Sequence, residues 1–431
     1  MSRYYLWTIG CQMNQAESER LAGFLEEQGY VVTASAEAAD LILLNSCVVR
    51  QSAEDRVINK LMALRSVKKV NPEAKIALTG CLVDANTEEL QRRFPHVDYY
   101  MKPGDTPYWL EVDQSTPSFP RNPGVTTFVP ISYGCNNFCT YCIVPYRRGR
   151  ERSRPVPEIK REVTELVHRG VKEVTLLGQN VDSYGCDLEG KPDLADLLTE
   201  LNNTDGLVRI RFLTNHPKDM SQKLVAAVAR LDAVCRVISL PVQSGSNEIL
   251  KAMRRGYTAA YYRDLISRIR GQIPEAALST DVIVGFPGES EADFGETVSL
   301  LAEIRFDTVH IAAYSTRPGT AAARELDDNV PVDLKKARLD TIERLQEKIA
   351  GEINNRLMDK VVAVLVEGRK KGKWYGRTES DKLVFFPGDG DYTGRIMNIR
   401  ISHISPWSLQ GVIDEDCREK LRGRNCQKVE F

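Results

Sequence analysis

Short apolar runs alternate with amphipathic stretches along most of the chain. In the first 100 residues, apolar or β-branched runs predict strands at Tyr4–Ile9, Leu41–Asn45 and Lys75–Thr79. Helical periodicity lies between them, at Ala16–Gln28 and Ala53–Val70. Strand–helix–strand order predicts a parallel sheet, and the carboxyl ends of parallel strands share one edge, where ligands bind.

A proline-rich segment at residues 100–127 interrupts this alternation and predicts a linker. A second alternation follows. Six strand–helix units are too few for the eight-stranded barrel, so we expect an open, partial barrel. The predicted strands are Val129–Ser132, Val171–Leu177, Val208–Thr214, Val237–Pro241, Leu278–Val284 and Thr308–Tyr314, and the predicted helices include Glu158–His168, Leu194–Leu201, Lys218–Leu231 and Glu291–Ile304.

The last third of the chain changes pattern. Pro331–Met358 has apolar residues on one helical face and predicts a connecting helix. Glycine turns and short strand-forming runs then predict a small β-barrel, with strands at Val361–Val366, Gly376–Thr378, Leu383–Phe386 and Arg395–Ile401. The fold class is therefore α/β with a terminal β-barrel, and the predicted domains are residues 1–120, 121–356 and 357–431.

Composition sets the cellular context. The 431 residues are 42% hydrophobic and 27% charged, as is ordinary for a soluble globular protein. We recognise no signal peptide and no apolar stretch of membrane-spanning length, so we expect a cytoplasmic protein without a membrane partner. In a reducing cytosol, ten cysteines indicate metal or redox chemistry rather than disulfides.

Cys135, Cys139 and Cys142 lie within eight residues, just after the first strand of the second alternation. Closely spaced thiolates hold iron–sulfur clusters. A zinc knuckle or a disulfide would also use clustered cysteines, but zinc needs a fourth ligand nearby and no His or Cys follows until His168. Three thiolates on a four-iron cube leave one iron open for chemistry.

A second set of cysteines follows the three strands of the first segment. Cys11, Cys47 and Cys81 each stand at a strand end, and glycine precedes two of them. Three separate buried thiols are the plainer interpretation. Because the placement recurs at three strand ends of one sheet, we favour a second three-cysteine site. For Cys186, Cys235, Cys417 and Cys426 we expect no function.

Other loops on the same edge of the predicted partial barrel carry amides and glycines, which suit a polar cofactor. Each loop alone reads as an ordinary turn, and a lone His216 beside a proline is most often a satisfied loop residue. Taken together they predict a pocket for a cofactor with ribose or amino-acid groups, which the resemblance described below implies is S-adenosylmethionine (SAM). The expected cofactor contacts are Gln179, Asn180, Gln243, Ser244, Ile283 and Glu289.

Charge is nearly balanced, with a formal net value of −1, but basic residues exceed acidic ones toward the C-terminus. An arginine run at residues 147–154 is by itself more typical of a solvated face. In the predicted β-barrel, basic residues interleave with aromatic ones, a combination that binds phosphates and unpaired bases, although such aromatics are also ordinary core. The expected RNA contacts are Lys370, Lys371, Lys373, Trp374 and Arg377.

The spacing of Cys135, Cys139 and Cys142 resembles the signature of radical SAM enzymes. With the other two segments, nearly the whole chain resembles the methylthiotransferase family, including its C-terminal TRAM-like domain. Gly10–Asn14, Asn45–Arg50 and Leu177–Gly185 are similar to the members that act on dimethylallyladenosine in tRNA. Gly80–Asp84 differs from the usual sequence of the family after the cysteine but keeps the cysteine itself.

The resemblance implies addition of a methylthio group to carbon 2 of isopentenylated adenosine at tRNA position 37. It implies two [4Fe–4S] clusters, one on each cysteine set, and two SAM molecules per turnover: one yields the deoxyadenosyl radical and the other methylates the sulfur. The implied partners are the tRNA anticodon stem-loop, an electron donor such as flavodoxin or ferredoxin, and a sulfur donor. No protein side chain beyond the cluster ligands is expected to be catalytic.

Other functions remain open at this point. Relatives of the same family act on threonylcarbamoyladenosine in tRNA or on a ribosomal-protein aspartate. An iron–sulfur electron-transfer protein would need the clusters but no SAM pocket. A non-catalytic RNA-binding module would need only the C-terminal residues and would leave both cysteine sets unexplained.

Overall fold

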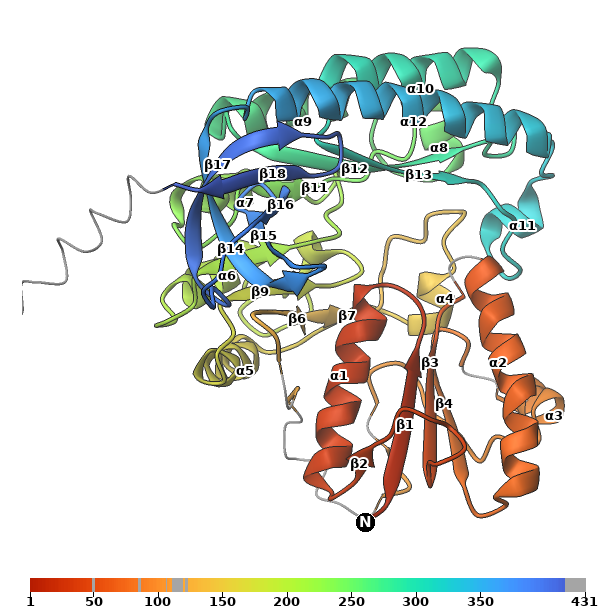
Figure 1. Cartoon of the computed structure of the whole chain (residues 1–431). Coiled ribbons are helices and arrows are strands. Elements are labelled where there is room, and N and C mark those ends of the chain that lie inside the picture. Colours follow the sequence, from red (N-terminus) through yellow and green to blue (C-terminus); the bar gives the residue numbers. More distant parts are fainter. Residues whose placement is uncertain (49–50, 84–86, 106, 111–118, 121–122, 415–431) are drawn as a thin grey trace, which may run out of the picture.

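Figure 1 shows a computed structural model of the chain. The residues it describes are 1–48, 51–83, 87–105, 107–110, 119–120 and 123–414. Cys417 and Cys426, for which we expect no function, lie outside them, as do Arg50, Asp84 and Pro117 of the segments considered above.

A five-stranded sheet forms the N-terminal part. Its strands are β1 (Arg3–Thr8), β2 (Val31–Val32), β3 (Leu41–Ser46), β4 (Lys75–Gly80) and β5 (Tyr99–Tyr100), and its helices are α1 (Gln12–Glu27), α2 (Gln51–Val70) and α3 (Glu88–Arg93). All pairs are parallel, as predicted, with strand order β2-β1-β3-β4-β5. The two outer strands have only two residues each, too few to give a periodic signal.

Strand β3 is buried along its whole length, because a helix covers each face of the sheet (Figure 1). Leu41 and Leu43 pack with Phe24 of α1, whereas Ile42 and Leu44 pack with α2. The strand order is that of flavodoxin-like folds, in which the ligand binds at the carboxyl edge between β1 and β3, where the order reverses. Cys11, Cys47 and Cys81 follow β1, β3 and β4 at this edge.

The central part has six parallel strands: β6 (Thr126–Pro130), β9 (Glu173–Leu177), β10 (Arg209–Phe212), β11 (Val237–Ser239), β12 (Ala277–Val284) and β13 (Thr308–Ala313). They form two three-stranded sheets, joined by a parallel bridge between Ile210 and Val234. One apolar core runs through both sheets and the helices around them. The open partial barrel is thus confirmed.

The helices of this part pack on the outside of the barrel or lie beside its cysteine-bearing loop. They are α4 (Val144–Arg148), α5 (Val156–His168), a short 3₁₀ helix (Val181–Ser183), α6 (Leu194–Asn202), α7 (Gln222–Arg230), α8 (Asn247–Ala252), α9 (Ala259–Gln272), α10 (Glu291–Ile304), α11 (Ala321–Glu325) and α12 (Val332–Asn355). Helix α7 begins four residues later than predicted, because the Ser221 hydroxyl caps it by accepting from the Leu224 N–H at 3.1 Å.

The strand predicted at Val129–Ser132 is wrong in its extent. Barrel strand β6 ends at Pro130, and the next residues form β7 (Ser132–Tyr133), which pairs antiparallel with β8 (Arg152–Ser153). The three clustered cysteines therefore lie in a loop whose base is closed by a short two-stranded ribbon.

The C-terminal part is a closed five-stranded barrel, in the order β14-β15-β16-β18-β17. Its strands are β14 (Val361–Lys370), β15 (Lys373–Thr378), β16 (Leu383–Phe386), β17 (Ile396–Ile404) and β18 (Leu409–Ile413). Strand β18 was not among the predicted strands. It closes the barrel by pairing parallel with β16 and antiparallel with β17.

Trp374 does not occupy the surface position expected of an RNA contact. Alternation along β15 turns it into the barrel core, where it is 7% exposed and its ring contacts Tyr392. Its indole N–H donates to the Gly388 carbonyl at 3.0 Å. The neighbouring Tyr375 is half-buried and pairs with Phe385 across the strands. A base has no access to Trp374 while the barrel is folded.

Two arginines of β10 fasten this barrel to the central part. Arg211 donates to the Thr378 and Glu379 carbonyls at 2.8 and 2.9 Å and pairs with Glu173 at 2.8 Å. Arg209 donates to the Arg377 carbonyl at 2.7 Å. Because both arginines are buried and hydrogen-bonded to the barrel backbone, they hold the C-terminal barrel against the central part.

Among the described residues, no helix combines the length and the apolar character that crossing a membrane requires.

Candidate active site

Cys11, Cys47 and Cys81 converge at the carboxyl edge of the N-terminal sheet. The two glycines that precede cysteines show how tightly the backbone is packed there. A Cβ on Gly10 would lie 2.8 Å from the Cys47 Cβ, and one on Gly80 would lie 2.3 Å from the Ser46 carbonyl oxygen. Both glycines have positive φ, at +139° and +88°, which other residues rarely adopt.

Asn14 ties these strand ends together from the first turn of α1. Its side-chain amide donates to Asn45 Oδ1 and to the Ser46 carbonyl, both at 2.8 Å. Its oxygen accepts from the Cys11 thiol at 3.2 Å. Asn45 returns a bond to the Asn14 carbonyl at 2.9 Å. Both asparagines are fully buried, so the positions of Cys11 and Cys47 are set by a satisfied polar network.

Arg148 reaches this cysteine set from the central part of the chain. It ends α4, and its side chain is 2% exposed. Its Nε donates to Cys81 Sγ at 3.2 Å and its Nη1 to Glu17 at 2.5 Å. Burial alone would lower the pKa of Arg148, but the charge of Glu17 and the bond to Cys81 raise it above its ordinary value, so the group stays cationic.

The loop that carries Cys135, Cys139 and Cys142 is held from two sides. Thr140 donates through its N–H to the Met253 carbonyl and through its hydroxyl to the Ala252 carbonyl, at 3.1 and 2.9 Å. Its own carbonyl accepts from the Ala322 N–H at 2.8 Å. The Cys142 N–H donates to the Cys139 carbonyl at 3.0 Å, which closes a tight turn. The cysteines are thus placed by α8 and α11.

Arg255 donates a hydrogen bond to a sulfur of this cysteine set, as Arg148 does to a sulfur of the N-terminal set. It is buried, and its Nη1 donates to Cys139 Sγ at 3.3 Å and to the Tyr141 hydroxyl at 3.4 Å. Its Nη2 donates to the Pro241 carbonyl at 2.9 Å. Each cysteine set therefore has one buried arginine on a sulfur, and hydrogen bonds to sulfur tune cluster potentials.

The buried thiols would ionise more readily beside a bound metal. Burial raises the pKa of Cys81 to about 11 and that of Cys142 to about 12, and it also raises the pKa of Cys135. Coordination to a metal supplies the cationic charge that favours the thiolate. A four-iron cube would bind each of three thiolates on a separate iron. Within the described residues, no group of three or more His, Cys, Asp or Glu side chains is placed to hold a metal ion.

The predicted cofactor loops contain buried polar atoms that have no hydrogen-bond partner. Asn180 Oδ1, Gln243 Oε1 and His216 Nε2 are buried without a hydrogen bond to any described residue. They follow β9, β11 and β10, at the same carboxyl edge as the cysteine loop. Unpaired buried polar atoms are costly, so these three fit a polar ligand such as SAM. The interpretation of His216 as a satisfied loop residue is wrong.

A hollow of about 520 Å³ lies between the barrels, within the roughly 300–1,000 Å³ typical of ligand pockets. It extends from the N-terminal part, along residues of β11, β12 and β13, to the C-terminal barrel. Its lining includes Gln12, Thr214, Ser239, Asp281, His310 and Trp407. Gln12 adjoins Cys11, so the hollow leads toward the first cysteine set.

Comparisons with known proteins account for all three parts. Residues 3–102 match uncharacterized protein family UPF0004, residues 129–301 the Radical SAM superfamily and residues 358–413 the TRAM domain. The tRNA-2-methylthio-N(6)-dimethylallyladenosine synthase of Dehalococcoides mccartyi strain CBDB1 is 55% identical over 410 residues, which cover 95% of this chain and 98% of the relative. This chain belongs to that family.

A same-named relative from Chloroflexus aurantiacus is 50% identical over 424 residues, covering 95% of this chain and 91% of the relative. Among solved structures, the radical SAM methyltransferase TsrM of Kitasatospora setae aligns with a TM-score of 0.55 at 14% identity, covering 75% and 74% of the two chains. The cobalamin-dependent radical SAM enzyme OxsB has a TM-score of 0.51 at 11% identity, covering 80% and 56%. These two show the fold alone.

Family membership confirms the predicted resemblance, the fold class and the enzyme class. The chain is a radical SAM methylthiotransferase, and its cofactors include an iron–sulfur cluster and SAM. The domain boundaries at residues 120 and 356 stay predictions.

Three other residues expected at the cofactor site already have partners or packing. The Ser244 hydroxyl contacts Thr297 Oγ1 at 3.2 Å and accepts from the Ser246 N–H at the same distance. Glu289 accepts from the Gly285 N–H and from Arg338, both at 2.6 Å. Ile283 packs in the cluster that holds Tyr141. Ser244 therefore shapes its loop, and Ile283 adjoins the cysteine loop. Glu289 is bonded through Oε2 alone, and its Oε1 is buried without a hydrogen bond to any described residue, like the unpaired atoms of Asn180, His216 and Gln243.

The expected RNA contacts differ in availability. Lys370 and Lys371 are exposed at the turn between β14 and β15. Lys373 is exposed and donates to Gln410 Oε1 at 2.8 Å, while half-buried Arg377 pairs with Asp381 at 3.2 Å and lines the hollow. Gln179, expected at the cofactor site, is half-buried.

Sequence reasoning missed the two arginines that contact sulfur. Arg148 belongs to the arginine run interpreted as a solvated face, and that interpretation is wrong for Arg148 and for Arg154, which pairs with Glu162 at 2.5 Å. The sequence feature that could have indicated Arg148 is its nearness to Cys142, because Arg148 ends the short helix that begins two residues after this cysteine. Nothing near Arg255 in the sequence signalled its role.

Replacing Arg148 tests how strongly the N-terminal site depends on the central part. In Arg148→Met, the buried Glu17 carboxylate loses its counter-charge, which we expect to destabilise the protein by roughly 3–5 kcal/mol. Thermal unfolding of the full chain measures this loss. The double variant Glu17→Gln/Arg148→Met has no uncompensated charge and should recover most of it. Equal loss in both variants would contradict the ion-pair explanation.

Proposed function

We propose that this protein adds a methylthio group to carbon 2 of isopentenylated adenosine at position 37 of tRNA. The observation that carries the proposal is the pairing of two three-cysteine sites, each with a buried arginine on one sulfur, in a chain that aligns over 95% of its length with dimethylallyladenosine-modifying relatives. Those relatives favour this substrate over threonylcarbamoyladenosine or a ribosomal protein.

Each cysteine set would hold its own [4Fe–4S] cluster and keep one iron open, because each contributes three thiolates. When bound, the clusters and two SAM molecules per turnover would supply the one-electron chemistry that an unactivated C–H bond requires. The residues of the chain then have positioning roles. Arg148 and Arg255 would orient the sulfurs, and Asn180, His216 and Gln243 would hydrogen-bond SAM.

The hollow between the barrels would receive the target nucleoside. It is lined by all three parts of the chain, so a base inside it would face residues next to both the N-terminal cysteine site and the central strands. Its volume is ample for one modified nucleoside. The rest of the stem-loop would lie outside, over the C-terminal barrel, which matches the TRAM domain.

The remaining partners follow from the reaction. An electron donor such as flavodoxin or ferredoxin would reduce the cluster of Cys135, Cys139 and Cys142, and a sulfur donor would supply the inserted atom. The reaction on tRNA would occur in the cytoplasm.

Nucleoside analysis of tRNA from a deletion strain tests the proposal. We expect the methylthiolated nucleoside to disappear and isopentenyladenosine to accumulate, with both changes reversed by the wild-type gene. An unchanged nucleoside profile in the deletion strain would overturn the proposed substrate.

The exposed basic turn of the C-terminal barrel should bind tRNA phosphates. Reversing the charge of Lys370, Lys371 and Lys373 should weaken tRNA binding and flatten its salt dependence, because each lost phosphate contact removes roughly 0.7–0.9 from the slope of log K against log salt. Affinity measured across a salt series gives both quantities. Reversal of three other exposed lysines, Lys69, Lys191 and Lys336, is the matched control. Equal effects of the two triple reversals would show non-specific charge attraction.

A further inference from the structure

Trp407 is the large aromatic side chain that the C-terminal barrel presents to solvent, and it is 60% exposed. It stands in the turn between β17 and β18. That turn is rigid, because the Ser405 N–H donates to the Ser408 carbonyl at 2.9 Å and the Ser408 N–H to the Ser405 hydroxyl at 3.0 Å. Asn354 of α12 is buried and donates to the Ser405 and Pro406 carbonyls at 2.8 and 3.0 Å. The backbone that carries Trp407 is therefore fixed before any partner arrives.

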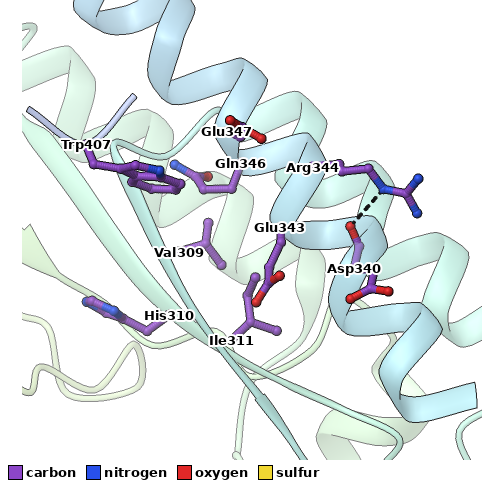
Figure 2. Close-up of a pocket in the computed structure, with 9 residues that line it drawn as sticks. All are labelled: Val309, His310, Ile311, Asp340, Glu343, Arg344, Gln346, Glu347 and Trp407. Atoms are coloured by element: carbon purple, nitrogen blue, oxygen red, sulfur yellow. Dashed lines mark hydrogen bonds between the residues drawn. The ribbon is translucent and has the colours of Figure 1, made fainter. Parts of the chain in front are cut away.

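The ring borders a second hollow, of about 670 Å³, between β13 and α12 (Figure 2). Asp340, Glu343 and Glu347 line it from the helix, and His310 lines it from the strand. Arg344 extends away from Trp407 in Figure 2, and its Nε donates to the Asp340 carbonyl at 3.1 Å. Carboxylates thus outnumber cations among the lining residues, so this hollow disfavours a phosphate and can accept hydrogen bonds from amino groups.

Trp407 also lines the hollow proposed to receive the target nucleoside, as His310 does. Trp407 therefore borders both the hollow that leads toward Cys11 and the hollow lined by carboxylates. A nucleobase next to the target would meet an aromatic face there and, beyond it, acceptors for its amino edge. Aromatic stacking holds unpaired bases in many RNA-binding proteins, and carboxylates accept from base amino groups.

We propose that Trp407 stacks an unpaired base adjoining the target nucleoside, with Glu343 or Glu347 accepting from its amino edge. The proposal rests on the proposed tRNA substrate. It assigns to Trp407 the stacking role that buried Trp374 does not fulfil. The basic turn at Lys370 and Lys371 would bind phosphate, so base and backbone contacts are divided between two places on the same barrel.

The test compares Trp407→Ala with Tyr108→Ala, a control aromatic of equal exposure, 60%, in the N-terminal part. The probe is an RNA anticodon stem-loop that carries isopentenyladenosine. Loss of one stacked base should weaken the affinity of Trp407→Ala for this RNA by roughly 5- to 150-fold. The affinity of Trp407→Phe should lie between those of the wild type and Trp407→Ala. The affinity of Tyr108→Ala should be unchanged. Iron content and circular dichroism confirm that each variant is folded.

Abasic RNAs identify the base. We expect the effect of Trp407→Ala to vanish when the neighbouring nucleotide on the 5′ or the 3′ side of the target lacks its base, because the ring then has nothing to stack on. An equal effect on both abasic RNAs, or unchanged affinity of Trp407→Ala for the intact stem-loop, would overturn the stacking role. Unchanged affinity would instead leave the exposed ring for a protein partner. Failure of the wild-type protein to bind the stem-loop would count against the tRNA function itself.

Discussion

Replacing Cys135, Cys139 and Cys142 with alanine removes about half of the iron and abolishes SAM cleavage, if each three-cysteine site holds one four-iron cluster of its own. The physical reason is the independence of the two ligand sets. The loop of Cys135–Cys142 is held by α8 and α11, whereas Cys11, Cys47 and Cys81 are held by the N-terminal sheet and Asn14. Iron analysis and deoxyadenosine formation measure the two effects.

Arg255→Lys is the matched variant for this experiment. It keeps a cation beside Cys139 and leaves all six thiols in place, so it should retain iron at both sites while shifting the spectrum of one cluster. Full iron retention by the triple alanine variant would show that these cysteines hold no cluster, and the assignment of the site would be lost.

The complementary variant, with alanine at positions 11, 47 and 81, should still cleave SAM but yield no methylthiolated tRNA. The residues proposed to bind SAM, Asn180, His216 and Gln243, follow other strands, so the change leaves them in place. It would lose the three thiolates of the proposed second cluster, at which we place the sulfur. Deoxyadenosine and modified nucleoside are measured in the same reaction.

A serine set at these three positions provides the control for volume, because serine nearly preserves the packing around Gly10 and Gly80 while removing the thiolates. Both sets should have the same phenotype. Formation of methylthiolated tRNA by either would show that the N-terminal site is not the sulfur site, and failure of both to cleave SAM would show that the two sites are not independent.

Sequence periodicity predicted the parts of the fold that repeat over many residues. The strands that precede Cys11, Cys47 and Cys81 end at Thr8, Ser46 and Gly80, and their bounds were predicted to within one residue from short apolar runs. Parallel topology then required their ends to meet. The convergence of these cysteines was therefore predictable from the order of strands and helices alone.

Single side chains whose role depends on a distant segment were not predictable in this way. Arg148 is buried because Glu17 and Cys81, both far away in sequence, meet it. Trp374 and Tyr375 differ in burial because successive side chains of β15 point to opposite faces, and the sequence did not show which face lies inside the barrel. Trp407 gave no signal, because the turn that presents it lies between strands whose pairing only the fold defines.

Helix α4 has one further consequence, for the exchange of segments between relatives. It begins two residues after Cys142 and delivers Arg148 to Cys81, so the shape of one metal pocket is encoded partly within the loop that forms the other. A chimera joined in the proline-rich segment at residues 100–127 would combine a foreign N-terminal sheet with a resident arginine. Recombination should succeed only when Asn14, Glu17 and α4 are inherited from the same parent.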